Sequence, residues 1–141
     1  MAGPDTSEDR ERFVREAFTE TMEADGVPAV AEFFAPDLAY YRSAGDLAGF
    51  ENLERDVEMF RTAFPDMEAT IGRLVAGEDR VSFLYTLTGT HQGEFDGIPP
   101  TNREVDAKGA AIARIENGLI AEYRIVFDNL GMLEQLGVLG E

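Results

Sequence analysis

VDAKGAAIARIENGLIAEYRIVFD, residues 105–128, contains two runs rich in apolar residues that flank Asn117-Gly118. Asn-Gly between two such runs is typical of a two-residue β-hairpin turn, because both residues tolerate the positive φ angles of a type I′ turn. We therefore expect the runs to pair as antiparallel strands, with Glu116 opposite Leu119 and each further pair one residue farther from the turn.

This register places Ala107 opposite Asp128 and predicts a face on which small residues oppose ionisable or apolar ones. The other pairs on that face are Gly109–Val126, Ala111–Arg124, Ala113–Glu122 and Ile115–Ile120. Small side chains there leave room above the sheet, and a partly apolar hollow with a few converging polar groups is typical of a small-molecule site. The alternative is that the small residues serve close packing, while Arg124 and Glu122 form a solvated ion pair.

The opposite face of the hairpin is expected to carry Tyr123, Ile125 and Phe127 and therefore needs cover. Packing of this face against the sheet of a second copy, in a homodimer, would supply that cover.

The rest of the chain predicts helices first and strands afterwards. Helical spacing of apolar residues predicts helices over 7–24, between Pro28 and Pro36, and from about Leu53 to Pro65. A short strand is expected at 38–42, a hairpin around 77–79 and a long loop over 89–103. This order predicts an α+β fold with the helices on one face of an antiparallel sheet.

Composition limits the classes of partner. The 141 residues include 44% apolar residues, which is enough for one domain over 1–141 with residues 1–6 as a flexible lead. The formal net charge of −16 argues against binding nucleic acid or an anionic membrane. Such an acidic, lysine-poor composition is typical of halophilic cytoplasm, where salt screens the repulsion between carboxylates.

The chain has no cysteine and one histidine, which excludes disulfides and thiolate chemistry and leaves little to bind a metal. The N-terminal residues lack the basic and apolar regions of a signal peptide, and no run of about 18 apolar residues occurs. We therefore expect a cytoplasmic protein without a metal.

Several motifs occur in a consistent order. They are FPD (64–66), GTHQGEF (89–95), GIPPT (97–101), NG (117–118), FD (127–128) and QLG (135–137). Together they resemble the SnoaL-like polyketide cyclase and ester cyclase family of the nuclear-transport-factor-2-like superfamily. The resemblance covers nearly the whole chain. It implies a cone-shaped barrel, with N-terminal helices packed on a curved, mostly antiparallel sheet, and assembly as a homodimer or homotetramer.

The resemblance also implies an activity. Characterised cyclases of the family close an aromatic polyketide ring by intramolecular aldol condensation, without a cofactor, and use a pocket aspartate as acid/base. Asp128 occupies the matching position in this chain. The chain departs from the family pattern at Arg124, where many relatives have tryptophan, and at Tyr41, where histidine is frequent. These departures leave the substrate open, and the fold alone does not fix the reaction.

The candidate site residues each have two interpretations. Asp128 is either a general acid/base or the cap of a C-terminal helical turn. Arg124 either anchors an enolate oxygen or pairs with a rim carboxylate, and His91 either donates to a substrate carbonyl or has a structural role. Tyr41 and Tyr85 line the interior as substrate contacts or as core aromatics. The loop over 93–103 is expected to act as a lid or as a dimer contact.

Two functions follow as alternatives. The first is a cofactor-free enzyme of the lyase or isomerase type, which cyclises or isomerises a small apolar carbonyl compound with Asp128 as acid/base. The second is a non-catalytic module of the same fold that binds a small ligand. An Asp128 bonded to backbone donors would favour the second.

Overall fold

The computed structural model describes residues 6–23, 26–42 and 47–138, which form four helices and one six-stranded sheet. In chain order the elements are α1 (Ser7–Met22), α2 (Val27–Phe33), β1 (Phe34–Tyr41), β2 (Leu47–Ala48), α3 (Phe50–Ala63), β3 (Glu68–Ala76), β4 (Arg80–Thr90), β5 (Glu104–Glu116), β6 (Leu119–Phe127) and α4 (Asn129–Leu136). This confirms the predicted α+β class. Of the expected flexible lead, residues 1–5 lie outside the described residues.

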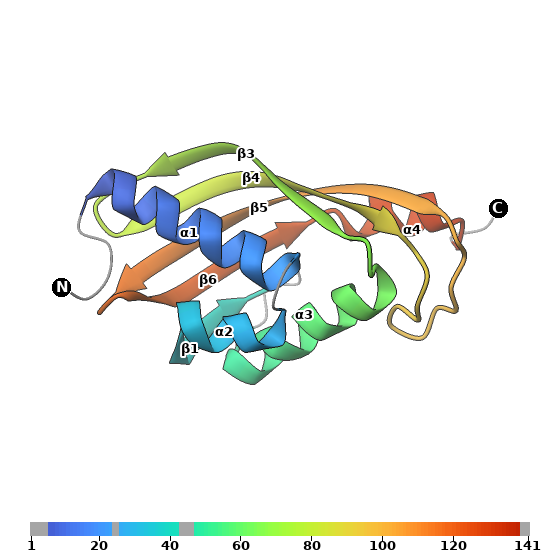
Figure 1. Ribbon diagram of the computed structural model, residues 1–141, viewed down its shortest axis with the longest axis horizontal. Helices are drawn as coiled ribbons and strands as arrows, with labels where there is room; N and C mark the ends of the chain where they lie inside the picture. Colours follow the sequence, from blue (N-terminus) through green and yellow to red (C-terminus); the bar gives the residue numbers. More distant parts are fainter. Residues whose placement is uncertain (1–5, 24–25, 43–46, 139–141) are drawn as a thin grey trace.

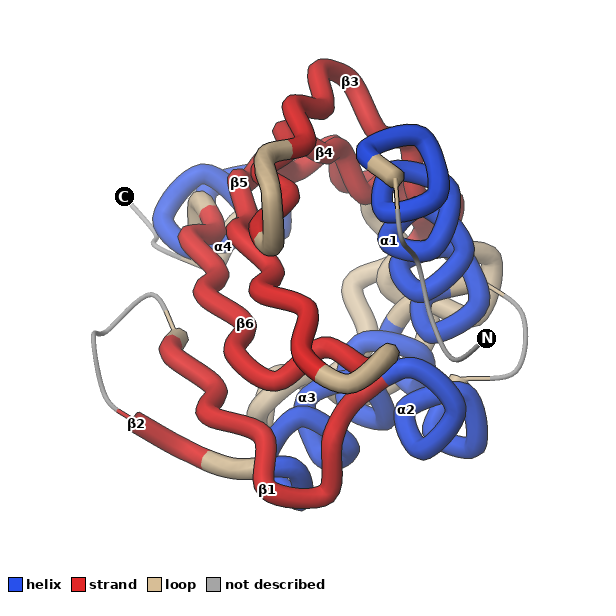
Figure 2. Tube along the Cα trace, turned by 90° about the vertical axis from the view of Figure 1, so that its left-hand side faces the viewer, coloured by secondary structure: helices blue, strands red, loops and turns tan. Residues whose placement is uncertain are grey.

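The sheet order is β2-β1-β6-β5-β4-β3, and every neighbouring pair is antiparallel except β1 and β6, which run parallel. Figure 1 shows the long strands β3 to β6 as a twisted layer with α1, α2 and α3 on one side. In Figure 2 the sheet bends from β3 round to β1, and these three helices close the open side. The result is the expected cone, with α4 packed against β5 at one end.

None of the helices within the described ranges has the length and apolar composition needed to cross a bilayer.

The ends of the elements follow local chemistry. The Thr6 side chain accepts a hydrogen bond from the first turn of α1, and α3 ends just before Pro65. β1 begins at Phe34, earlier than the predicted 38–42, and contains Pro36. Its pairing with β6 is irregular between Phe34 and Ala39, so the missing N–H of proline breaks no regular ladder there.

The last hairpin has the predicted turn but not the predicted register. Asn117 and Gly118 have φ angles of 54° and 81°, and the pair Ile115–Ile120 lies where the sequence predicts it. The register then shifts by one residue, because Ala121 has no partner and forms a β-bulge. Beyond the bulge the pairs are Arg114–Glu122, Ala113–Tyr123, Ile112–Arg124, Ala111–Ile125, Ala110–Val126 and Gly109–Phe127.

The shift exchanges the two faces of β6. The expected placement of Arg124 and Val126 over the small residues of β5 is wrong, because a shift of one residue turns every later side chain to the other face. Tyr123, Ile125 and Phe127 instead face the interior, opposite the alanines and Gly109. These three apolar side chains are therefore covered within the chain and need no second copy.

Gly109 shows why β5 needs small residues. A Cβ at this position would lie 2.4 Å from the ring end of Tyr85 and 2.6 Å from the Val126 carbonyl oxygen. The Tyr85 ring stacks on the Phe127 ring, with centroids 6.4 Å apart and planes 9° apart. The small residue thus serves close packing, which is one of the two interpretations open from the sequence.

We expect Gly109→Ala to destabilise the protein by about 1–3 kcal/mol, because the new methyl group forces the Tyr85 ring or the backbone of β6 to move. Gly72→Ala is the matched control, since a Cβ there would meet its nearest atom at an ordinary 3.7 Å. Urea unfolding of both variants measures the difference, and equal stabilities would show that the close approach at Gly109 is unimportant.

Candidate functional site

A cavity of about 650 Å³ lies between the concave face of the sheet and the helices. Its wall is mainly apolar, with Met22, Leu53 and Val57 among the aliphatic side chains. Eight aromatic residues contribute to it: Phe18, Phe34, Tyr40, Phe60, Tyr85, Phe95, Tyr123 and Phe127. This volume and lining are typical of sites for small organic molecules.

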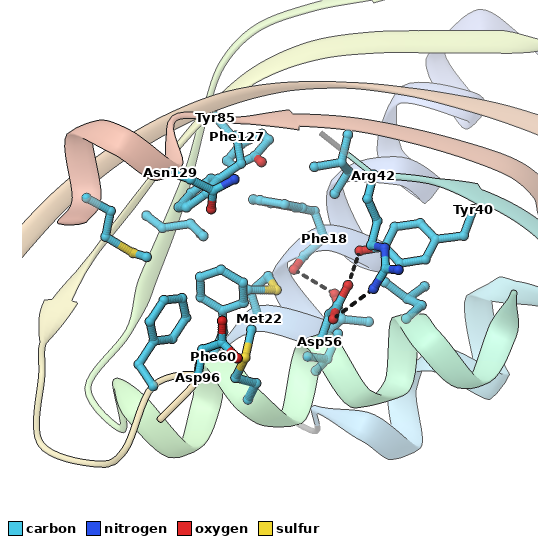
Figure 3. Close-up of a pocket in the computed structure, with 18 of the residues that line it drawn as sticks. Phe18, Met22, Tyr40, Arg42, Asp56, Phe60, Tyr85, Asp96, Phe127 and Asn129 are labelled. Atoms are coloured by element: carbon cyan, nitrogen blue, oxygen red, sulfur yellow. Dashed lines mark hydrogen bonds and ion pairs between the residues drawn. The ribbon is translucent and has the colours of Figure 1, made fainter. Parts of the chain in front are cut away.

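A cluster of three polar side chains, Tyr40, Arg42 and Asp56, lies at one end of this cavity (Figure 3). The Tyr40 hydroxyl donates a hydrogen bond of 2.7 Å to Oδ2 of Asp56. Nη1 of Arg42 lies 3.8 Å from Oδ1 of the same carboxylate. We call these three residues the polar cluster.

Regular secondary structure positions the polar cluster. Asp56 lies in the middle of α3, three residues after Leu53 and next to Val57, so it shares the inward face of that helix. Tyr40 lies on β1, where its pairing with Tyr123 of β6 puts both rings on the concave face. The two rings are stacked, with centroids 6.2 Å apart.

Three tyrosine hydroxyls are held in the protonated form. Burial raises the pKa of Tyr40, Tyr85 and Tyr123 far above that of a free tyrosine. For Tyr40, the hydrogen bond to the Asp56 carboxylate raises the pKa further, because it favours the protonated phenol. All three therefore serve as hydrogen-bond donors at neutral pH.

A loop and α4 line the other end of the cavity. Phe95, Asp96 and Ile98 come from the loop between β4 and β5, and Asn129 and Met132 come from α4. Figure 3 shows Asp96 and Asn129 on the side away from the polar cluster. The loop expected to act as a lid or as a dimer contact thus contributes to the cavity wall at this end.

His91 lies at the base of that loop and has no exposed surface. Its Nδ1 accepts a hydrogen bond of 3.1 Å from the Thr101 amide, and its ring lies 5.5 Å from that of Phe64. Its Nε2 is buried without a partner in the described part of the chain. His91 does not line the cavity, so its contacts match the structural interpretation.

Arg124 and Tyr41 lie together on the convex face of the sheet. The Arg124 guanidinium carbon is 3.8 Å from the centre of the Tyr41 ring, and its Nε donates a 2.9 Å hydrogen bond to Glu122. Neither Arg124 nor Tyr41 lines the cavity. The bulge at Ala121 explains why Arg124 lies on the convex face. Because Tyr40 faces inward, the adjacent Tyr41 faces outward.

Asp128 is exposed and caps α4. Its Oδ1 accepts a 2.9 Å hydrogen bond from the Gly131 amide, as the capping interpretation expects. The neighbouring residues Phe127 and Asn129 line the cavity, whereas Asp128 does not. Of the five predicted site residues, Tyr85 is the one that lines it.

The prediction from the sequence missed the polar cluster. A detectable signal existed, because Asp56 is an ionisable residue on the apolar stripe of its helix, between Leu53 and Val57. Within the described residues, no three histidine, cysteine or acidic side chains gather closely enough to hold a metal ion.

We expect Asp128→Ala to lower the stability of the protein by about 1 kcal/mol, because the Gly131 amide loses its side-chain acceptor. Asp128→Asn should be nearly neutral, since asparagine caps a helix about as well as aspartate. Thermal unfolding of the two variants compares them, and an equal loss in both would assign the effect to the charge of Asp128.

Solved structures similar to this one cover almost the whole chain. AclR of Streptomyces galilaeus, a candidate hydroxylase, superposes with a TM-score of 0.87 at 26% identity, over 96% of this chain and 85% of its own. IdmH of Streptomyces antibioticus, a candidate polyketide cyclase, gives 0.78 at 28% identity, over 91% and 98%. A candidate SnoaL-like polyketide cyclase of Jannaschia sp. CCS1 gives 0.82 at 21% identity, over 93% and 92%.

A comparison with curated protein sequences found no match. The profile of the SnoaL-like polyketide cyclases matches residues 12–136, which is most of the chain and spans every element that lines the cavity. The chain therefore belongs to the SnoaL-like polyketide cyclase family.

Proposed function

We propose that this protein binds a small, largely apolar, carbonyl-bearing molecule in its cavity. The observation that carries this proposal is the cavity itself, with aromatic walls and polar groups that converge at one end. The walls provide apolar contact area, and hydrogen-bond donors such as Tyr123 fit a carbonyl oxygen. Membership of the SnoaL-like family supports a small-molecule ligand.

Two candidate functions use this binding. A cofactor-free aldol-type cyclisation or isomerisation is supported by the family and by the candidate polyketide cyclases among the similar structures. A non-catalytic ligand-binding module is supported by Asp128, whose carboxylate is engaged by the Gly131 amide. Asp128 can act as the acid/base only if the ligand extends to the N-terminus of α4, beside Phe127.

The net charge of −16 supports a saline cytoplasm as the working environment. At high salt the repulsion between surface carboxylates is screened, so the acidic surface then carries a smaller electrostatic cost.

We also propose that the protein forms a homodimer through the convex face of the sheet. Directly paired residues lie side by side on this face. Across the strands, these pairs form three rows of side chains at the centre of the face: Ser82–Ile112–Arg124–Tyr41, Leu84–Ala110–Val126 and Thr86–Lys108. Leu84, Ile112 and Val126 are 53%, 42% and 65% exposed, so the middle row and its neighbour present an apolar patch. We call these three rows the convex patch.

Charge favours a second copy as the partner of this patch. The chain has 28 acidic residues, yet none lies in the three rows. The cations Lys108 and Arg124 are paired with Asp106 and Glu122 at 3.0 and 2.9 Å. Two copies with a charge of −16 repel each other less where carboxylates are few and neutralised, as in a twofold contact between convex patches, where the flanking Asp106 and Glu122 are paired with cations.

We expect Ile125→Phe to weaken ligand binding at least ~10-fold, because the larger side chain fills part of the cavity. Leu130→Phe is the matched control, since it enlarges an exposed residue that lies outside both the cavity lining and the convex patch. Calorimetric titration with 2-tetralone, a bicyclic ketone, measures both. Equal affinities would place the ligand outside the cavity, and the absence of binding by the wild type would count against the proposed ligand class.

We expect Leu84→Glu and Val126→Glu to convert the dimer to a monomer, because each places a carboxylate in the apolar row of a face that meets itself. Leu130→Glu is the control, since Leu130 is 62% exposed but lies on α4. Sedimentation velocity in salt should give twice the chain mass for the wild type and the control. A monomeric wild type would contradict the proposal.

A further inference from the structure

We propose that Asp56 is the proton acceptor for a carbonyl compound bound in the cavity, with Tyr40 as its positioning residue. This inference rests on the proposed binding function and adds an acid–base site at the polar cluster. The substrate class is a molecule with a flat apolar body and an enolisable carbon, one that carries a hydrogen next to a carbonyl group.

The location of Asp56 distinguishes it from the other carboxylates. Among the residues that the structure describes, two carboxylates line the cavity, those of Asp56 and Asp96. Asp96 lies on the loop, at a position with a positive φ of 48°, whereas Asp56 lies within the α3 helix. A group that must meet a reacting carbon within a few tenths of an ångström is better held by a helix than by a loop.

The partners of Asp56 hold its carboxylate in one orientation. Tyr40 occupies Oδ2 at 2.7 Å, and Arg42 lies near Oδ1 at 3.8 Å. The side chain keeps 22% of its surface exposed, so it remains accessible from the cavity.

Hydrogen-bond donors for the substrate oxygen lie beside the polar cluster. The Tyr123 ring stacks on Tyr40, and the hydroxyl of Tyr123 is kept protonated by burial. Tyr85 provides a second protonated hydroxyl on the cavity wall. In the described part of the chain, neither hydroxyl donates to a protein acceptor. Both are therefore available to stabilise an enolate oxygen.

The chemical step is balanced within the bound molecule. Asp56 takes a proton from the carbon next to the carbonyl group, the electron pair of that C–H bond forms the C=C bond, and the carbonyl π pair moves to oxygen. If the proton returns to the same carbon or to a conjugated one, the result is exchange or isomerisation. If the enolate carbon attacks a second carbonyl group, a C–C bond forms and the new alkoxide takes the proton from Asp56.

Proton exchange tests this step without knowledge of the natural substrate. Wild-type protein in heavy water should exchange the hydrogens next to the carbonyl group of 2-tetralone faster than buffer alone, as followed by proton NMR. Asp56→Asn should lower the protein-dependent rate at least ~100-fold. The asparagine oxygen still accepts from Tyr40, so calorimetry should give an unchanged affinity for 2-tetralone.

The control variant is Asp79→Asn, which changes an exposed carboxylate that pairs with Arg80 and does not line the cavity, and it should exchange at the wild-type rate. Tyr40→Phe should lower the rate constant of the bound ketone and leave its dissociation constant unchanged, which separates positioning from a general loss of structure. Wild-type exchange in Asp56→Asn would overturn the inference, as would binding of 2-tetralone without exchange. Failure of the wild type to bind the ketone would instead count against the proposed function.

Discussion

The bulge at Ala121 is the constraint on which the cavity depends. One extra residue in β6 puts Tyr123, Ile125 and Phe127 on the concave face and sends Arg124 to the convex face. Without it, the regular hairpin would turn charged side chains into the interior, where each would need a partner. A local irregularity in one strand therefore decides whether the cone is apolar inside.

The small residues of β5 complement this arrangement. Gly109 leaves room for the ring of Tyr85, which stacks in turn on Phe127. The aromatic side chains of β4 and β6 thus lie over the strand between them. Because α1, α2 and α3 cover the same concave side, the space that remains is bounded by rings and helix side chains.

The side chains of the polar cluster are paired with one another. A carboxylate in an apolar enclosure is costly unless it has donors and a countercharge, and Asp56 has Tyr40 and Arg42. The strand β1 supplies Tyr40, and the helix α3 supplies Asp56 16 residues later. The interaction therefore joins α3 to β1 as well as placing a charge inside the cone.

Much of the fold could be predicted from the sequence because its signals are local. The Asn117-Gly118 turn, the proline that ends α3 and the helical spacing of apolar residues each act over a few positions. The resemblance to the SnoaL-like family predicts the cone shape of the sheet. The site is harder to predict, because the bulge at Ala121 has no local sequence signature and regular pairing beyond Ile120 gives the wrong faces. The large apolar side chains of Tyr123, Ile125 and Phe127 are a sequence signal for the correct register, since such residues favour the buried face over the outer one.

Tyr40 and Tyr41 illustrate the same difficulty. Two adjacent tyrosines on a strand must face opposite ways, but the sequence does not indicate which one faces inward. That choice depends on the parallel pairing of β1 with β6, which is irregular around Pro36. Long-range pairing therefore selects the residue that meets Asp56, whereas the cap at Asp128 could be foreseen from its local sequence.

The attachment of the loop to α3 has an evolutionary consequence. The amides of Gln92 and Gly93 both donate to the Ala63 carbonyl oxygen, at 2.9 and 3.1 Å, so the loop is fixed where the helix ends. Asp96, an exposed residue just beyond this attachment, can be replaced over generations without disturbing the turn of α3 that carries Asp56, whereas the buried Phe95 packs on Phe60 of that helix. Changes at this exposed loop position and retention of the proposed base can thus proceed separately within one small domain.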